Sequence, residues 1–195
     1  MTGLPRASTS AWTADVVRDD LRSITDVFRA HGASPPRIVW NPRPSDITAP
    51  PLRFLLERWI ALKADAGGVP HDRQIDLASL EPAAGYLMLI EPIDDGRDFR
   101  YLTYGDILAR ISNIDMTGRR LSEHPASAYA IDFGLAVYHA VCERREPIYS
   151  ERHPAGARDA TVWLRLVLPF VDDAGTVVRL ISGSVAIGRD GELLR

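Results

Sequence analysis

Two pairs of strand-like segments flank a helical middle in the second half of this chain, and this order constrains the fold more than any single residue. Strand-like runs cover residues 85–93 and 98–105, with the turn-rich residues 94–97 between them. A second pair covers residues 161–171 and 176–187, joined by Asp172-Asp173-Ala174-Gly175. Two extended runs around a short Asp/Gly turn are typical of a β-hairpin. Two hairpins around helical segments predict a sensor-like antiparallel sheet rather than an enzyme fold.

Length and charge narrow the class of protein. The chain has 195 residues, 46% of them hydrophobic, which suits one domain with extensions. It carries 23 basic and 26 acidic residues, for a formal net charge of -3, and no basic block is longer than a pair such as Arg119-Arg120. Nucleic-acid-binding domains concentrate basic residues on one face, so we expect no direct binding to DNA or RNA.

Cysteine content and hydropathy indicate the cellular compartment of the protein. Cys142 is the sole cysteine, which excludes an intramolecular disulfide and a cysteine-based zinc cluster and fits a reducing compartment. The sequence has no apolar run near the roughly 20 residues of a membrane span and no secretory leader pattern at its beginning. We therefore expect a cytoplasmic protein without a membrane association.

The first 51 residues are predicted to form an extension. Val17, Leu21, Ile24 and Phe28 recur at helical spacing, which predicts one amphipathic helix over residues 10–30. Its apolar stripe either covers the domain's own sheet or packs against a second copy of the chain in a homodimer. Six prolines between positions 33 and 51 then favour extended or turn structure, as in a linker or strap.

A second helix is predicted over residues 51–66, with proline in its first turn and Gly67 at its end. Leu52, Leu55, Trp59 and Leu62 form its apolar stripe. The predicted organisation is therefore a helix and strap over residues 1–51, a helix and connecting loop over residues 52–80, and a core over residues 81–195.

Several short motifs follow one another in a characteristic order between residues 52 and 187. They are Trp59, Pro70, Arg73, Ile75-Asp76, Leu80, Asp98-Phe99-Arg100-Tyr101, Gly105, Asp115-Met116-Thr117-Gly118 and Arg165-Leu166-Val167-Leu168-Pro169. In this order they resemble the single-domain PAS proteins of alphaproteobacteria, the PAS_5 family. Leu77 departs from the pattern, because the family usually has proline there.

The resemblance implies an α+β fold with a five-stranded antiparallel sheet in the order 2-1-5-4-3. It also implies helices on one face of this sheet, with a cavity between them, and an N-terminal helical extension. Alternation supports the buried sheet: Val162, Leu164, Leu166 and Leu168 point one way and form the better core candidates. The third strand, within residues 146–152, is charged and contains Pro147, which predicts an edge strand.

Candidate ligand-binding residues lie on the second and fourth strands and on the helices between them. They are Tyr101, Tyr104, Ile107, Ile111, Tyr129, Phe133, Trp163 and Arg165. For each, the alternative is an ordinary core or sheet-surface residue. Arg165 is the sharpest candidate, because an arginine in an apolar strand requires a carboxylate, an acidic ligand or solvent. If an acidic ligand binds, Arg165→Ala is expected to abolish that binding in a calorimetric titration.

Cofactor chemistry can be weighed on two residues. The long helix predicted over residues 126–144 would cover the cavity, and haem-binding PAS proteins place a histidine there, which makes His139 a candidate haem ligand. His139 lies at the rim of the helix's apolar sector, so a partly buried or surface histidine is the favoured interpretation. A flavin photosensor would need a reactive cysteine near residues 106–116, whereas Cys142 is on the long helix. We therefore do not expect flavin photochemistry.

Two functions follow from these patterns. The first is a non-catalytic sensory or regulatory PAS domain that binds a small molecule, a signalling partner protein, or both. The second is an interaction domain with a filled core and no ligand, which dimerises through its N-terminal helix. An enzyme ranks below both, because the sequence offers no nucleophile, base and orienting group in a recognisable pattern and no metal-ligand cluster.

Overall fold

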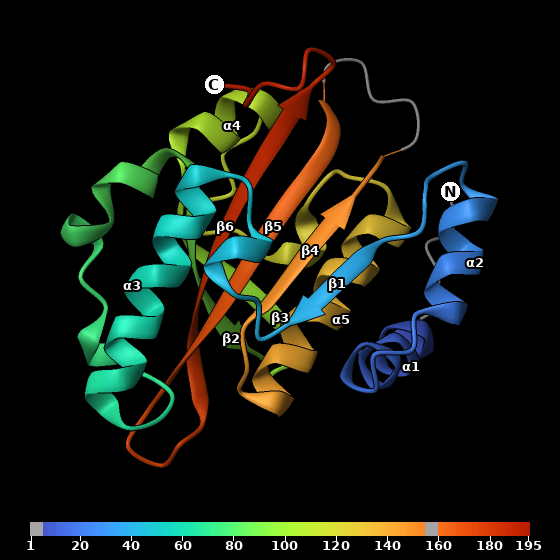
Figure 1. Cartoon of the computed structure of the whole chain (residues 1–195). Coiled ribbons are helices and arrows are strands. Elements are labelled where there is room, and N and C mark those ends of the chain that lie inside the picture. The colour runs from blue at the N-terminus through green and yellow to red at the C-terminus, as the bar shows by residue number, and fades with distance from the viewer. Residues whose placement is uncertain (1–5, 155–159) are drawn as a thin grey trace.

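The computed structural model describes residues 6–154 and 160–195, which form an α+β fold around an open, six-stranded antiparallel sheet (Figure 1). The strands are β1 (Arg37–Trp40), β2 (Leu87–Ile93), β3 (Asp98–Tyr104), β4 (Ile148–Arg152), β5 (Ala160–Val171) and β6 (Val177–Gly188). They lie in the order β1-β4-β5-β6-β2-β3. The two longest, β5 and β6, form the centre of the sheet.

The strand order extends the predicted one by a strand. The five expected strands lie next to one another as β3-β2-β6-β5-β4, and β1 adds a sixth beside β4. The prediction of five strands was therefore wrong, and so was the assignment of residues 146–152 to an edge. Ile38, Val39 and Trp40 have high strand propensity, and they pair with β4 from Ser150 to Ile148 within the segment expected to be a strap.

Helices cover both faces of the sheet, whereas one covered face was expected. On one face lies α3 (Pro50–Ala66), which ends at Gly67 as predicted, together with the 3₁₀ segment η3 (Leu77–Tyr86). On the other face lies α5 (Ala128–Arg144), with the 3₁₀ segment η4 (Leu121–Glu123) against it, while α4 (Asp106–Ser112) packs against η3 and β6 and contributes to the cores on both faces. Two further 3₁₀ segments, η1 (Pro44–Asp46) and η2 (Asp72–Gln74), lie in the loops on either side of α3. Figure 1 shows α3 and α5 on opposite sides of the strands.

The N-terminal segment contains two helices, not the single helix expected over residues 10–30. They are α1 (Arg6–Val17) and α2 (Arg22–Ala30), separated by a turn in which Asp19 has a left-handed φ of 58°. Both helices pack against α5, and their apolar side chains Trp12, Val16, Ile24 and Phe28 are buried there. The N-terminal helices thus cover α5 instead of the sheet.

The sheet separates two hydrophobic cores. Leu164, Leu166 and Leu168 of β5 pack with α3, whereas Val167 belongs to the core beneath α5. The alternation predicted for this strand is present, but both of its faces are covered. No helix in the described part of the chain is both long enough and apolar enough to cross a membrane.

Candidate functional site

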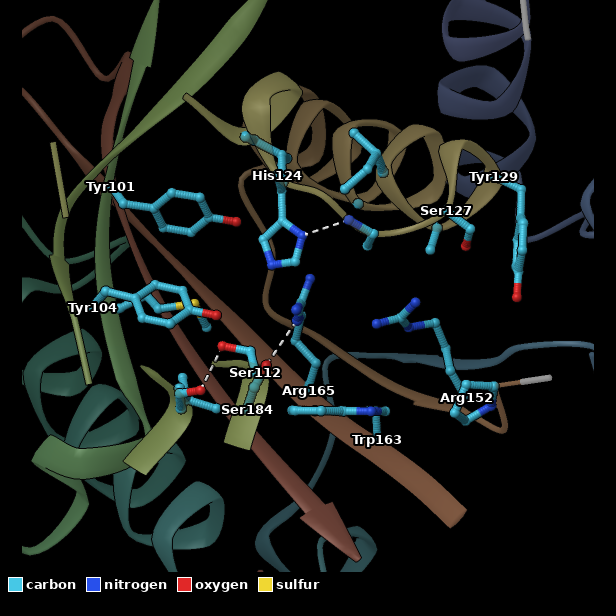
Figure 2. A pocket seen from close by; sticks show the side chains of 18 of the residues that line it. Tyr101, Tyr104, Ser112, His124, Ser127, Tyr129, Arg152, Trp163, Arg165 and Ser184 are labelled. Carbon is cyan, nitrogen blue, oxygen red and sulfur yellow. Dashed lines mark hydrogen bonds between the residues drawn. The ribbon is translucent and has the colours of Figure 1, made fainter. Parts of the chain in front are cut away.

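A cavity of about 210 Å³ lies between α5 and the sheet, and Phe28 of α2 also contributes to its lining. The main chain brings β3, β5, β6, α4, η4 and the start of α5 together around it (Figure 2). Its apolar lining includes Phe28, Met88, Leu108, Leu121, Ala126, Ala130, Ile131, Gly134 and Pro154. Its polar or aromatic lining includes Tyr101, Tyr104, Ser112, His124, Ser127, Tyr129, Arg152, His153, Trp163, Arg165 and Ser184.

Arg165 extends from the middle of β5 into this cavity. Its Nε donates a hydrogen bond to Oγ of Ser184, its neighbour across the β5–β6 ladder, at 2.8 Å. The guanidinium carbon lies 6.0 Å from the ring centre of Tyr138 on α5. Within residues 6–154 and 160–195, Arg165 forms no ion pair and no other hydrogen bond. Its two terminal nitrogens, which carry four of the five donors of a guanidinium, remain available to a ligand.

The charge of Arg165 is retained despite its surroundings. Burial alone lowers the pKa of a guanidinium, because it disfavours the charged form. The phenol groups of Tyr138, Tyr101 and Tyr104 act in the opposite direction, and the pKa of Arg165 is raised from its ordinary value. A half-buried positive charge therefore faces the cavity at neutral pH.

Two tyrosines of β3 flank this charge. The rings of Tyr101 and Tyr104 are nearly perpendicular, with centres 5.4 Å apart. Burial raises the pKa of Tyr101 well above its ordinary value, and burial is also the main cause of the raised pKa of Tyr104. Both are neutral phenols at physiological pH, and Figure 2 shows their hydroxyl groups directed toward the space in front of Arg165.

His124 lies on the opposite wall, directly after η4. Its Nδ1 accepts a hydrogen bond from the backbone N–H of Ala126 at 3.1 Å. Burial, followed by the positive charges of Arg165 and Arg152, lowers the pKa of His124. A neutral imidazole that accepts at Nδ1 carries its proton on Nε2, so His124 presents a donor. Arg165, the tyrosines and His124 together suit the recognition of a negatively charged group.

The cavity contains five of the eight candidate ligand-binding residues: Tyr101, Tyr104, Tyr129, Trp163 and Arg165. Three others lie elsewhere. Ile107 packs on the α3 side of the molecule, near Gly85, because it points to the opposite side of α4 from Leu108. Phe133 is buried among the N-terminal helices, with its ring 5.5 Å from that of Phe28. Ile111 is half-buried and is not among the residues that line the cavity.

Six polar residues of the cavity were not among the candidates: Ser112, His124, Ser127, Arg152, His153 and Ser184. Ser184 is recognisable only through the strand register, which places it opposite Arg165. Arg152 ends β4, a strand that was expected at the sheet edge. For both residues the missing information was which strand lies beside which, and at what register.

His139 and Cys142 lie outside this cavity. The His139 ring packs edge-on against Phe99 of β3, with centres 5.1 Å apart. Burial lowers the pKa of His139, and its Nε2 is buried without a hydrogen-bond partner among the described residues. Burial also raises the pKa of the Cys142 thiol to about 12. These positions favour neither a haem ligand in the cavity nor a reactive thiolate.

Comparisons with protein-family models, curated proteins and solved structures gave no match to this chain. The arguments for function therefore come from the fold and the cavity.

Proposed function

We propose that this chain is a non-catalytic sensory or regulatory domain of the PAS type, which holds a small acidic molecule between α5 and the sheet. The observation that carries this proposal is Arg165. It is a half-buried cation whose hydrogen-bond partner in the described structure is a neutral serine, and it faces an unfilled space. An unpaired charge in such a position is unfavourable for folding, and an acidic ligand would offset that penalty.

The shape of the fold supports a sensor of this type. The strand order β3-β2-β6-β5-β4 is the order that the PAS resemblance implies, and the cavity lies under the long helix where a PAS ligand would bind. A mostly apolar cavity with a few converging polar groups is the usual form of a small-molecule site. The resemblance and the cavity thus favour the same function.

Hydrogen bonding within the cavity favours binding over catalysis. Ser112 donates to the backbone oxygen of Leu108 at 2.7 Å, and Ser184 accepts from Arg165. Across the described ranges, neither serine forms a hydrogen bond with a histidine, as a nucleophile and its base would. The polar groups of the cavity are arranged to hold a ligand.

Helix α5 connects the cavity to the N-terminal helices, so it could transmit the effect of ligand binding to them. Tyr129 lines the cavity at the start of this helix, and the ring of Phe28 on α2 contacts both Tyr129 and Phe133 of α5. A shift of α5 on ligand binding would therefore reposition α1 and α2. We propose that a signalling partner protein recognises this surface, with or without a second copy of the chain.

The alternative function is an interaction domain with a filled core. This alternative requires that the cavity stay without a ligand and that the N-terminal helices form a dimer. The apolar side chains of α1 and α2 are already buried against α5 of the same chain. A dimer through these helices would need their other surfaces or an exchange between two copies.

Native mass spectrometry of the full chain tests the proposed function. Wild type, Arg165→Ala and Arg189→Ala, which changes an exposed arginine without an ion pair in the described structure, are purified in the same way. We expect a copurified acid on wild type and Arg189→Ala but not on Arg165→Ala. Each protein is then titrated with small carboxylic acids in a calorimeter, where Arg165→Ala should lose all binding. Binding that survives in Arg165→Ala, or no binding of any acid to wild type, would favour the filled-core alternative.

A further inference from the structure

The cavity contains a second half-buried cation, Arg152, the last residue of β4. In the sheet Arg152 lies opposite Trp163 of β5, one strand away from Arg165. Figure 2 shows its side chain on the other side of Arg165 from Tyr101 and Tyr104, with the guanidinium directed toward Arg165. The two arginines therefore reach the same cavity from neighbouring strands.

Arg152 has no compensating acid in the described part of the chain. It takes part in no ion pair there and donates no side-chain hydrogen bond. Burial lowers the pKa of Arg152 to about 10, and the positive charge of Arg165 adds to this effect. Both arginines are nevertheless charged at pH 7, and they repel each other across a poorly solvated space.

The remaining lining does not neutralise these charges. No aspartate or glutamate is among the described residues that line the cavity. His124 is neutral near pH 7 because its pKa is lowered. The cavity therefore carries about two uncompensated positive charges, and a ligand with one carboxylate would balance only one of them.

We propose that the natural ligand is a compact diacid, with one acidic group at Arg165 and the second at Arg152. This inference rests on the proposed function and specifies its ligand class. At Arg165 the two terminal nitrogens match the two oxygens of a carboxylate, and the hydroxyls of Tyr101 and Tyr104 can donate to the same group. Met88, Leu108 and the ring of Trp163 line the same cavity, which suits a short apolar or aromatic spacer.

Matched acids test this inference in the wild-type chain. Calorimetric titration compares pentanoate with glutarate and benzoate with isophthalate, since each pair differs mainly in the second carboxylate. We expect at least one diacid to bind at least tenfold more tightly than its monoacid. Monoacid binding without any diacid preference would overturn the diacid inference and leave the proposed function intact. Failure of all four acids to bind would overturn both.

Variants assign the second acidic group to Arg152. In Arg152→Gln, diacid affinity should fall at least tenfold, to the level of the monoacid, while monoacid affinity changes less than threefold. In Arg165→Gln, both affinities should be lost. Arg152→Lys keeps the charge without the planar fork and should retain part of the diacid preference, which provides a test if Arg152→Gln does not fold. Equal losses of monoacid and diacid affinity in both Arg152 variants, or no loss in either, would overturn the assignment. Arg189→Gln is the control and should behave as wild type.

Discussion

The two faces of the sheet are built differently, and strand β6 shows both within three residues. Gly183 faces α3, where a methyl group on it would lie 2.6 Å from Cδ2 of Leu52 and 2.7 Å from Cδ1 of Leu55. Its neighbours Ser182 and Ser184 face α5, where they accept hydrogen bonds from Tyr138 and Arg165. The α3 face is mostly apolar and has a smaller cavity of about 100 Å³ beside Trp59, whereas the α5 face contains more polar groups and the cavity of about 210 Å³. Under the proposed function, the α3 face serves mainly stability and the α5 face mainly ligand binding.

The largest expected effect compares two tryptophans. Trp59 of α3 is 3% exposed and donates from Nε1 to the backbone oxygen of Pro169 at 2.9 Å. Trp59→Ala should reduce the free energy of unfolding by about 3–5 kcal/mol, the usual result for a buried tryptophan. Trp163 of β5 is half-buried beside the cavity, so Trp163→Ala should cost less than half as much. Urea unfolding curves provide the measurement, and equal losses would contradict the contrast between the faces.

Replacing either of two glycines by alanine should change the free energy of unfolding by a smaller amount, with opposite signs at the two positions. Gly183→Ala forces a methyl group against two fully buried leucines and should destabilise the fold by about 1–3 kcal/mol. On Gly134, within α5, a methyl group would meet Leu121 at 3.7 Å and Nη1 of Arg165 at 3.9 Å, which are ordinary contacts. Gly134→Ala should therefore stabilise the fold by up to about 1 kcal/mol, since alanine favours a helix interior. Thermal unfolding of the two variants checks these signs. Destabilisation by Gly134→Ala would show that the cavity side is as closely packed as the α3 side.

The smallest predicted effect concerns pH. His124 and His139 both lie on the α5 face, and burial is the main cause of the lowered pKa of each. Because their folded pKa values lie below the ordinary value of 6.5, the unfolded chain takes up their protons first as the pH falls. The stability that the two neutral imidazoles contribute is fully present above pH 6.5. Below pH 6.5 it is lost, and the free energy of unfolding falls by no more than about 1.4 kcal/mol per pH unit for each proton.

Unfolding curves at pH 7, 6 and 5 measure this slope. His124→Asn and His139→Asn should each show a shallower loss of stability than wild type over this range. The comparison with wild type removes the contribution of Asp132, whose pKa burial raises and which therefore acts with the opposite sign. An unchanged slope in both variants would indicate that neither imidazole is kept neutral by its surroundings.

Sequence patterns predicted the hairpin strands of the sheet better than the N-terminal segment, which contains strand β1 and helices α1 and α2. The turns at residues 94–97 and 172–175, the helix end at Gly67 and the alternation of β5 are local features, and each has a local physical signal. Strand β1 was missed because its apolar residues lie among prolines, which suggested a strap. The break between α1 and α2 was missed because the helical spacing of Val17, Leu21, Ile24 and Phe28 continues across Asp19, although aspartate tolerates the left-handed conformation of a turn.

The same distinction applies to the cavity. Arg165 could be recognised from its own strand, because an arginine among alternating apolar residues stands out. Arg152 could not, since its position depends on how β4 pairs with β5, and Ser184 depends likewise on the β5–β6 register. Ile107 was misplaced because one residue of helical phase separates the α3 side of α4 from the cavity side. Non-local pairing and helical phase therefore set the limit of the sequence-based prediction.

The central claim is that Arg165 is retained for a ligand and not for the fold. The most direct test measures both the free energy of unfolding and the binding of glutarate for wild type and Arg165→Met. Removal of an unpaired, half-buried charge should leave the stability of the ligand-free protein unchanged or slightly higher, while glutarate binding is lost. A fall in stability of more than about 2 kcal/mol, larger than the net value of a typical hydrogen bond, or unchanged glutarate binding, would contradict the claim.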